Sequence, residues 1–192
     1  RDGGLDAAEA SIARLGLDAL VVIGGDDTLS VAAGLAKRGA AVVAVPKTMD
    51  NDVWGTEGCL GFDTAANIVT EALDRIQTTT SSHHRVAVVE VMGRDAGWVA
   101  AWGGLAGGAD AILVPESPID SVAIDRLVDL VTRRRSYATG ASVIVASEGV
   151  QLPEALLNLS GDVPRDEFGH PRLDKIAVGD AIAAILEERT GL

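Results

Sequence analysis

Two acidic residues stand directly after a pair of glycines in the segment Gly24-Gly25-Asp26-Asp27-Thr28. The segment follows a short apolar run and precedes a helical pattern, so it predicts a strand-to-helix turn. Glycines let the backbone turn sharply and approach a ligand closely, and the free N–H groups at a helix start favour an anion such as phosphate. Carboxylates repel an anion there unless a divalent cation lies between them. The segment therefore indicates either a metal-assisted phosphate site or two acids that merely cap the helix.

A cation, a hydroxyl and two carboxylates lie within one short segment, Pro46-Lys47-Thr48-Met49-Asp50-Asn51-Asp52. Residues two apart face the same side of an extended backbone, so Asp50 and Asp52 are expected to converge on one site. A carboxylate near a substrate hydroxyl is a candidate general base, and Lys47 is suited to offset phosphate charge. The alternative is a proline-initiated turn rich in Asx residues.

Two further segments offer groups that bind phosphate or sugar. Arg94 follows a predicted strand and presents a planar fork that suits a phosphate, with a surface ion pair as the alternative. Glu148 follows another strand and is suited to sugar hydroxyls, with a solvated loop acid as the alternative. His83 and His84 lack a partner at ligand spacing, so they are interpreted as polar residues at a strand entry.

The elements that position these groups come from an alternation of apolar runs and helical patterns. The predicted strands are Ala19–Ile23, Ala41–Val45, Val86–Val91, Ala111–Val114 and Ser142–Ala146. The predicted helices are Asp6–Leu15, Leu29–Arg38, Thr64–Thr78, Gly97–Gly107, Ile124–Ser136 and Ile176–Arg189. Short, branched runs of this kind are typical of strands buried on both faces of a parallel sheet. The alternation predicts a doubly wound α/β fold of mostly parallel sheets with helices on both faces, whose ligands bind at the carboxyl ends of the strands.

Composition disfavours several classes of function. The formal net charge is −12, whereas nucleic-acid surfaces are basic, so no nucleic-acid partner is expected. No run approaches the roughly 18 apolar residues of a membrane span, and no leader sequence is expected. The single cysteine, Cys59, excludes an internal disulfide and fits a reducing cytoplasm. The segment Gln151–Arg172, with its prolines and acids, is interpreted as a solvated surface excursion.

Five motifs together resemble the phosphofructokinase family, in order and at similar spacing. They are Gly-Gly-Asp-Asp-Thr at 24–28, Pro-Lys-Thr-Met-Asp-Asn-Asp at 46–52, Gly-Phe-Asp-Thr-Ala at 61–65, Val-Glu-Val-Met-Gly-Arg at 89–94 and Ser-Glu-Gly at 147–149. The resemblance covers nearly the whole chain and is nearest to the bacterial branch that uses pyrophosphate or mixed donors. It implies a phosphofructokinase-like fold of Rossmann-like layers. It also implies a magnesium-dependent glycolytic phosphotransferase, a cytoplasmic location, and a homodimer or homotetramer.

The resemblance further implies a role for each matching residue. Residues 1–61 would belong to the phosphoryl-donor domain and residues 62–192 to the fructose 6-phosphate domain. The donor-binding residues would be Gly24, Gly25, Asp26, Asp27, Thr28 and Lys47, with Asp26 as the acid associated with magnesium. The substrate-binding residues would be Thr48, Met49, Asp50, Asp52, Arg85, Met92, Gly93, Arg94 and Glu148.

The implied chemistry centres on Asp50, which would accept the proton of the sugar's 1-hydroxyl. Lys47, Asp27 and Thr48 would complete the catalytic set. Arg85 is similar to an arginine that reaches fructose 6-phosphate bound in a neighbouring subunit, so its role would require at least a dimer.

The choice of phosphoryl donor depends on two residues. ATP-using members of the resembled family carry glycine at the positions of Asp27 and Lys47. A carboxylate at Asp27 would occupy space near the α-phosphate of a nucleotide and repel it, whereas pyrophosphate has no third phosphate and no nucleoside. Lys47 would add positive charge beside the transferring phosphoryl group. The pair predicts pyrophosphate as the donor, with Asp27 as the stronger discriminator, because some members that carry only the lysine use ATP.

Three alternatives are compatible with part of this pattern. They are an ATP-dependent 6-phosphofructokinase, an inactive regulatory homologue that senses phosphate, and an enzyme of the diacylglycerol- or NAD-kinase type. The last shares a Gly-Gly-Asp turn but does not explain the Lys47–Asp52 segment. Complete members of the resembled family have a Gly-rich phosphate loop before Arg1 and a Gln-Arg-Gly-Gly segment after Leu192. The chain is therefore expected to be an internal fragment with little or no activity by itself.

Overall fold

The chain divides into two compact units, Arg1–Phe62 and Asp63–Leu192. The computed structural model describes residues 2–136, 140–153 and 177–192. Each unit contains a three-stranded sheet in which every paired strand is parallel. Parallel strands joined through helices confirm the predicted α/β fold. Among the described residues, none of the helices combines the length and the apolar character that a membrane crossing requires.

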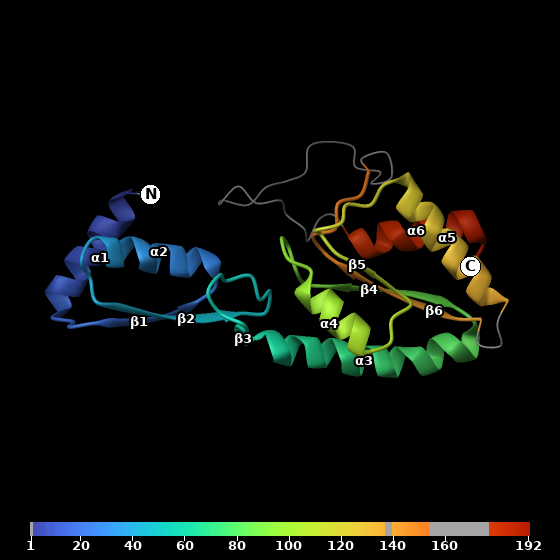
Figure 1. Cartoon of the computed structure of the whole chain (residues 1–192), viewed down its shortest axis with the longest axis horizontal. Coiled ribbons are helices and arrows are strands. Elements are labelled where there is room, and N and C mark those ends of the chain that lie inside the picture. The colour runs from blue at the N-terminus through green and yellow to red at the C-terminus, as the bar shows by residue number, and fades with distance from the viewer. Residues whose placement is uncertain (1, 137–139, 154–176) are drawn as a thin grey trace. The chain divides into compact units, whose positions relative to one another are not determined.

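The first unit packs two helices on a small sheet. Helices α1 (Asp2–Leu15) and α2 (Asp26–Lys37) accompany the strands β1 (Leu20–Gly24), β2 (Val42–Thr48) and β3 (Leu60–Gly61), in the sheet order β1-β2-β3. Both helices lie on the same side of this sheet (Figure 1). Arg38, at the end of α2, pairs with Asp6 of α1 at 2.6 Å and with Glu9 at 3.4 Å. The hydrogen bond from Arg38 to Asp6 raises the pKa of the guanidinium.

The strands β1 and β2 are not buried on both faces, so this part of the sequence prediction is wrong. Val21, Ile23 and Val43 are 66%, 60% and 59% exposed. Val21 is paired in register with Val43, and Ile23 lies two residues further along, so these side chains share one face of the sheet. Neither α1 nor α2 covers that face (Figure 1). We call Val21, Ile23, Val43 and the 57% exposed Leu60 the open sheet face.

The second unit has helices on both faces of its sheet, as predicted. It contains α3 (Phe62–His83), β4 (Val86–Val91), α4 (Trp98–Ala106), β5 (Ala111–Leu113), α5 (Ser121–Arg135), β6 (Ser142–Ser147) and α6 (Val178–Thr190). The sheet order is β4-β6-β5, and all six residues of the central strand β6 are buried. Val143 and Val145 face Leu73 of α3 and Ala100 of α4, whereas Ile144 and Ala146 face α5 and α6. Figure 1 shows the two pairs of helices on opposite sides of this sheet.

The predicted elements differ from the observed ones mainly at their ends. Strand β4 has the predicted bounds, but β2 continues beyond Val45 to Thr48, and α2 begins at Asp26 instead of Leu29. The short strand β3 was not predicted, because two residues are too few to give an apolar pattern. The predicted surface excursion Gln151–Arg172 lies mostly outside the described residues, as does Ile176 at the predicted start of the last helix.

Candidate active site

The carboxyl ends of β1 and β2 lie side by side in the first unit. Gly24 is paired in register with Pro46. A Cβ atom built on Gly25 would lie 3.6 Å from the Cβ atom of Thr48 and 3.9 Å from the carbonyl oxygen of Lys47. Parallel pairing therefore brings the Gly24–Thr28 turn next to the segment that begins at Lys47. These are the two segments in which the sequence placed the phosphoryl-donor and base residues.

Asp26 and Asp27 occupy the first turn of α2, where the helix dipole favours negative charge. The N-cap of α2 is Gly25, and no side chain caps the helix by a hydrogen bond, so neither acid is the N-cap. Both carboxylates are exposed. The described residues contain no group of three or more metal-binding side chains. A carboxylate at the start of a helix is chemically suited to hold a divalent cation together with a substrate phosphate.

The segment after β2 turns sharply instead of remaining extended. Asn51 has a φ of 54°, in the left-handed region. The expectation that Asp50 and Asp52 face the same side assumed extended backbone, so that reasoning does not apply to this pair. The backbone N–H of Asp50 donates to Thr48 Oγ1 at 3.2 Å. Asp50 is half-buried, whereas Lys47 and Asp52 are exposed and Met49 is 37% exposed.

In the second unit, the turn after β4 is held by the end of β6. The N–H of Gly93 donates to Glu148 Oε1 at 3.3 Å, and the Gly93 carbonyl accepts from Ser147 Oγ at 2.5 Å and from the N–H of Gly149 at 3.1 Å. Ser147 is completely buried. Gly93 has a φ of 140°, and a Cβ atom there would lie 2.6 Å from Ser147 Oγ. The structure thus brings the turn that contains Met92, Gly93 and Arg94 next to Glu148, and their role in substrate binding stays a prediction.

The guanidinium of Arg94, at this turn, has a nitrogen without a hydrogen-bond partner among the described residues. Within the described part of the chain, its Nε is the one buried side-chain nitrogen or oxygen that has no hydrogen-bond partner. Asp95 Oδ2 lies 3.6 Å from this nitrogen, which is an ion-pair distance and too long for a hydrogen bond. A buried donor without a partner is costly unless a ligand completes it. The arrangement suits an oxyanion such as a sugar phosphate.

Gly149 tolerates no side chain at this position, which gives a test of the turn. A Cβ atom on Gly149 would overlap the carbonyl oxygen of Arg94 and would lie 2.8 Å from that of Gly93. Because the clash is with backbone, we expect Gly149→Ala to lower the free energy of unfolding by about 3 kcal/mol, at the upper end of overpacking costs. Urea unfolding followed by circular dichroism measures this. Gly4→Ala is the matched control, because no atom lies within 4 Å of its Cβ position and alanine favours the helix. Equal stability of the two variants would contradict the described turn.

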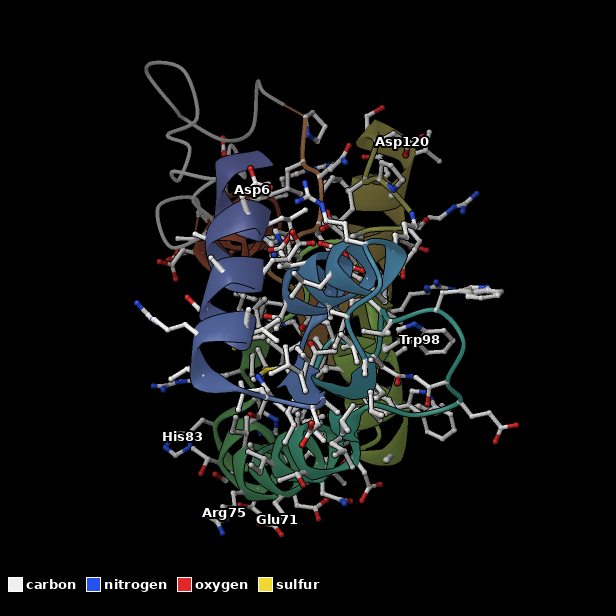
Figure 2. All side chains as sticks on the ribbon, turned by 90° about the vertical axis from the view of Figure 1, so that its left-hand side faces the viewer. Asp6, Glu71, Arg75, His83, Trp98 and Asp120 are labelled. Carbon is white, nitrogen blue, oxygen red and sulfur yellow. The ribbon has the colours of Figure 1, made fainter. Side chains whose placement is uncertain are left out.

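Arg85 is not brought to the group formed by Arg94 and Glu148. It stands directly before β4, whereas Met92 follows the strand. Six residues of parallel strand span about 20 Å. Within a single copy of this chain, Arg85 therefore lies at the opposite end of β4 from the group formed by Arg94 and Glu148. His83, at the end of α3, lies exposed at the surface (Figure 2).

Three residues at these sites were not singled out from the sequence as site residues. Asn51 closes the segment after β2, and Ser147 holds Gly93. Glu116 Oε1 accepts from the N–H of Gly97 at 2.9 Å, directly before α4. The ability of asparagine to adopt positive φ is a sequence signal that points to Asn51. The roles of Ser147 and Glu116 depend on contacts between distant segments, which a single sequence does not reveal.

Comparisons with known proteins agree with this picture. The family model described as phosphofructokinase matches residues 1–192. The pyrophosphate--fructose 6-phosphate 1-phosphotransferase of Amycolatopsis methanolica is 47% identical over 192 residues, which are 99% of this chain and 54% of that protein. ATP-dependent 6-phosphofructokinase 3 of Streptomyces coelicolor is 44% identical over 191 residues, which are 100% of this chain and 54% of that protein. The chain thus spans about half the length of these curated relatives.

Solved structures have the same fold. The pyrophosphate-dependent phosphofructokinase from Marinobacter aquaeolei matches with a TM-score of 0.72 and 27% identity, over 94% of this chain and 43% of that one. Phosphofructokinase from Saccharomyces cerevisiae matches with a TM-score of 0.73 and 28% identity, over 99% of this chain and 26% of that one. With a family model that spans all its residues, the chain belongs to the phosphofructokinase family.

Proposed function

We propose that the chain is the central part of a phosphotransferase that moves a phosphoryl group from pyrophosphate to the 1-hydroxyl of fructose 6-phosphate, giving fructose 1,6-bisphosphate. The observation that carries the proposal is the adjacency of the ends of β1 and β2. It places the start of α2, with Asp26 and Asp27, beside Lys47 and the segment that contains Asp50. A helix N-terminus, a cation and acidic groups in one place are the components of phosphoryl transfer.

We assign to the first unit the binding of the phosphoryl donor and the removal of the proton from the sugar 1-hydroxyl. Asp50 accepts the proton of the sugar 1-hydroxyl as that oxygen attacks the phosphoryl group. Its backbone N–H donates to Thr48 Oγ1, which restrains the backbone at this position. Lys47 offsets charge on the transferring group. Asp26 is the residue that would hold magnesium together with the pyrophosphate, and the ion would supply further positive charge there.

The second unit is assigned to fructose 6-phosphate. Arg94 binds an oxyanion of the substrate through its guanidinium, whose buried Nε has no hydrogen-bond partner among the described residues. Glu148 binds sugar hydroxyls and at the same time orders the turn through the N–H of Gly93. Arg85 of a second copy completes the phosphate site, so the active protein is at least a dimer. The proposed location of the reaction is the cytoplasm, as the family resemblance implies.

Pyrophosphate is favoured over ATP because Asp27 adds a negative charge at the start of α2, where a nucleotide would place a further phosphate. The 47% identity to a pyrophosphate-dependent protein supports this choice. The 44% identity to a protein named ATP-dependent makes ATP the second candidate donor. The residues at the strand ends, not overall similarity, therefore carry the choice of donor.

A donor assay on the full-length protein tests the proposal. Fructose 1,6-bisphosphate formation is followed with fructose 6-phosphate and magnesium, with either pyrophosphate or ATP as the donor. We expect turnover with pyrophosphate and at least about tenfold lower kcat/KM with ATP, which corresponds to about 1.4 kcal/mol. Turnover with ATP alone would overturn the pyrophosphate assignment, and no turnover with either donor would overturn the proposed activity.

A further inference from the structure

Asn51 stands between the proposed base, Asp50, and Asp52 in a conformation that few residue types adopt. Its φ is 54°. Among the described residues, the other non-glycine residues with positive φ are His84 and Ala177. Asparagine tolerates the left-handed region better than most residues, whereas β-branched and bulky residues are strained there. The reversal of the chain directly after Asp50 therefore depends on the residue type at position 51.

The side chain of Asn51 also ties the segment to a distant part of the first unit. Asn51 Oδ1 accepts a hydrogen bond from the backbone N–H of Cys59 at 2.8 Å. We call this hydrogen bond the tether. Cys59 is 6% exposed, so the donor end of the tether is buried. The next residue, Leu60, is paired in register with Lys47, and Gly61 is paired with Thr48. The amide of Asn51 thus closes a loop, residues 51–59, and the strand β3 that follows this loop is paired with Lys47 and Thr48, which lie three and two residues before Asp50.

Asp50 is consequently restrained on both sides. Its own N–H donates to Thr48 Oγ1 at 3.2 Å, and the following residue is held by its φ and by the bond to Cys59. Glycine at position 51 would permit the φ but lose the acceptor. Aspartate would keep an acceptor but add another negative charge between Asp50 and Asp52. Asparagine is the neutral residue that satisfies both requirements in a phosphate-binding segment.

We propose that Asn51 is a positioning residue that directs the carboxylate of Asp50 toward the substrate hydroxyl. This inference rests on the proposed function, since Asp50 acts as the base only there. A displacement of about 1 Å in a reacting group can lower a rate by about 10²-fold. The loss of the tether is therefore expected to lower kcat more than it weakens substrate binding.

The test uses three substitutions of Asn51 in the full-length protein. Asn51→Ala removes the acceptor and strains the φ, and kcat is expected to fall about 100-fold. Asn51→Gly removes the acceptor but tolerates the φ without strain, and kcat is expected to fall about tenfold. Asn51→Asp keeps an acceptor. Its kcat is expected to be at least about fivefold higher than that of Asn51→Ala. In Asn51→Ala and Asn51→Gly, the KM for fructose 6-phosphate is expected to stay within about threefold of the unsubstituted value.

Glu57→Gln is the matched control. Glu57 lies in the same loop, its side chain is exposed, and the hydrogen bond from Cys59 to Asn51 does not involve it. The kcat of this variant is expected to stay within about twofold, because the tether is intact. A fall in kcat equal to that of Asn51→Gly would show that any disturbance of the loop has the same effect, and would overturn the specific role of Asn51.

The reactivity of the Cys59 thiol reports on the tether without any assay of activity. Alkylation of Cys59 by iodoacetamide, followed by peptide mass spectrometry, is expected to be about tenfold faster in Asn51→Ala and Asn51→Gly than in Asn51→Asp, since opening the loop exposes the thiol. Equal alkylation rates in all variants would overturn the tether. Faster alkylation with an unchanged kcat would overturn the positioning role alone. If the unsubstituted protein transfers no phosphoryl group from either donor, the proposed function fails, and the role of Asn51 fails with it.

Discussion

Asp50→Asn is expected to lower kcat by about 10³-fold in the full-length protein, the largest effect of any single substitution considered for this chain. An amide has the shape of the carboxylate but cannot accept a proton at neutral pH, and a positioned base contributes about 10²–10⁴-fold. The KM for fructose 6-phosphate is expected to stay within about threefold, because the loss occurs in the transition state. Steady-state kinetics with pyrophosphate, fructose 6-phosphate and magnesium measure both parameters.

Asp18→Asn is the matched control for this substitution. Asp18 is an exposed acid of the same unit that stands just before β1, at the opposite end of the strand from Gly24. Its removal changes the net charge equally, but at the edge of the sheet away from the proposed site, so kcat is expected to be unaffected. A tenfold or smaller loss in Asp50→Asn would assign proton removal to another group and would leave Asp50 a binding role.

The double substitution Asp27→Gly and Lys47→Gly is expected to reverse the preference for the donor. The loss of Lys47 removes a cation beside the transferring group, so kcat/KM with pyrophosphate is expected to fall about 10²-fold or more. The loss of Asp27 removes repulsion of a nucleotide's additional phosphate. Two like charges about 4 Å apart near a protein surface repel by about 4 kcal/mol. We therefore expect kcat/KM with ATP to rise at least about tenfold.

The single substitutions separate the two contributions. Asp27→Gly alone is expected to admit ATP while pyrophosphate is still used, and Lys47→Gly alone is expected to weaken pyrophosphate use without admitting ATP. Lys37→Ala is the control for the removal of a cation, because Lys37 is exposed in the last turn of α2, at the far end of the helix from Asp27. If the ratio of kcat/KM with pyrophosphate to kcat/KM with ATP is unchanged in the double variant, neither Asp27 nor Lys47 selects the donor.

Local patterns in the sequence were sufficient to predict the strands that carry the site. The branched run Val86–Val91 became β4 with the same bounds, and the polar groups at the ends of β1 and β2 lie next to each other, as expected for parallel neighbours. Glycine and aspartate after a strand gave the position of the turn into α2. These features depend on residues close together in the chain, so a single sequence can reveal them.

Features that depend on distant contacts were not predictable in the same way. The apolar run of β1 looks the same whether helices cover one face of the sheet or both, so the exposure of Val21 and Ile23 was missed. The chain reverses at Asn51, so Asp50 and Asp52 are not two residues apart in extended backbone, as was assumed when they were expected to face the same side. The bond from Ser147 to the Gly93 carbonyl joins residues 54 positions apart. Only the folded chain shows which backbone groups such side chains reach.

The open sheet face has a consequence for how the 192-residue chain behaves at high concentration. Its four aliphatic side chains are each more than half exposed, and they form an apolar surface that attracts other copies of the chain at short range. The net charge of −12 opposes contact between copies by long-range repulsion. Salt shortens the reach of that repulsion from about 30 Å at 0.01 M to about 10 Å at 0.1 M and leaves the apolar attraction in place. Light scattering by the chain is therefore expected to rise with ionic strength, the reverse of what a charge-driven assembly would show.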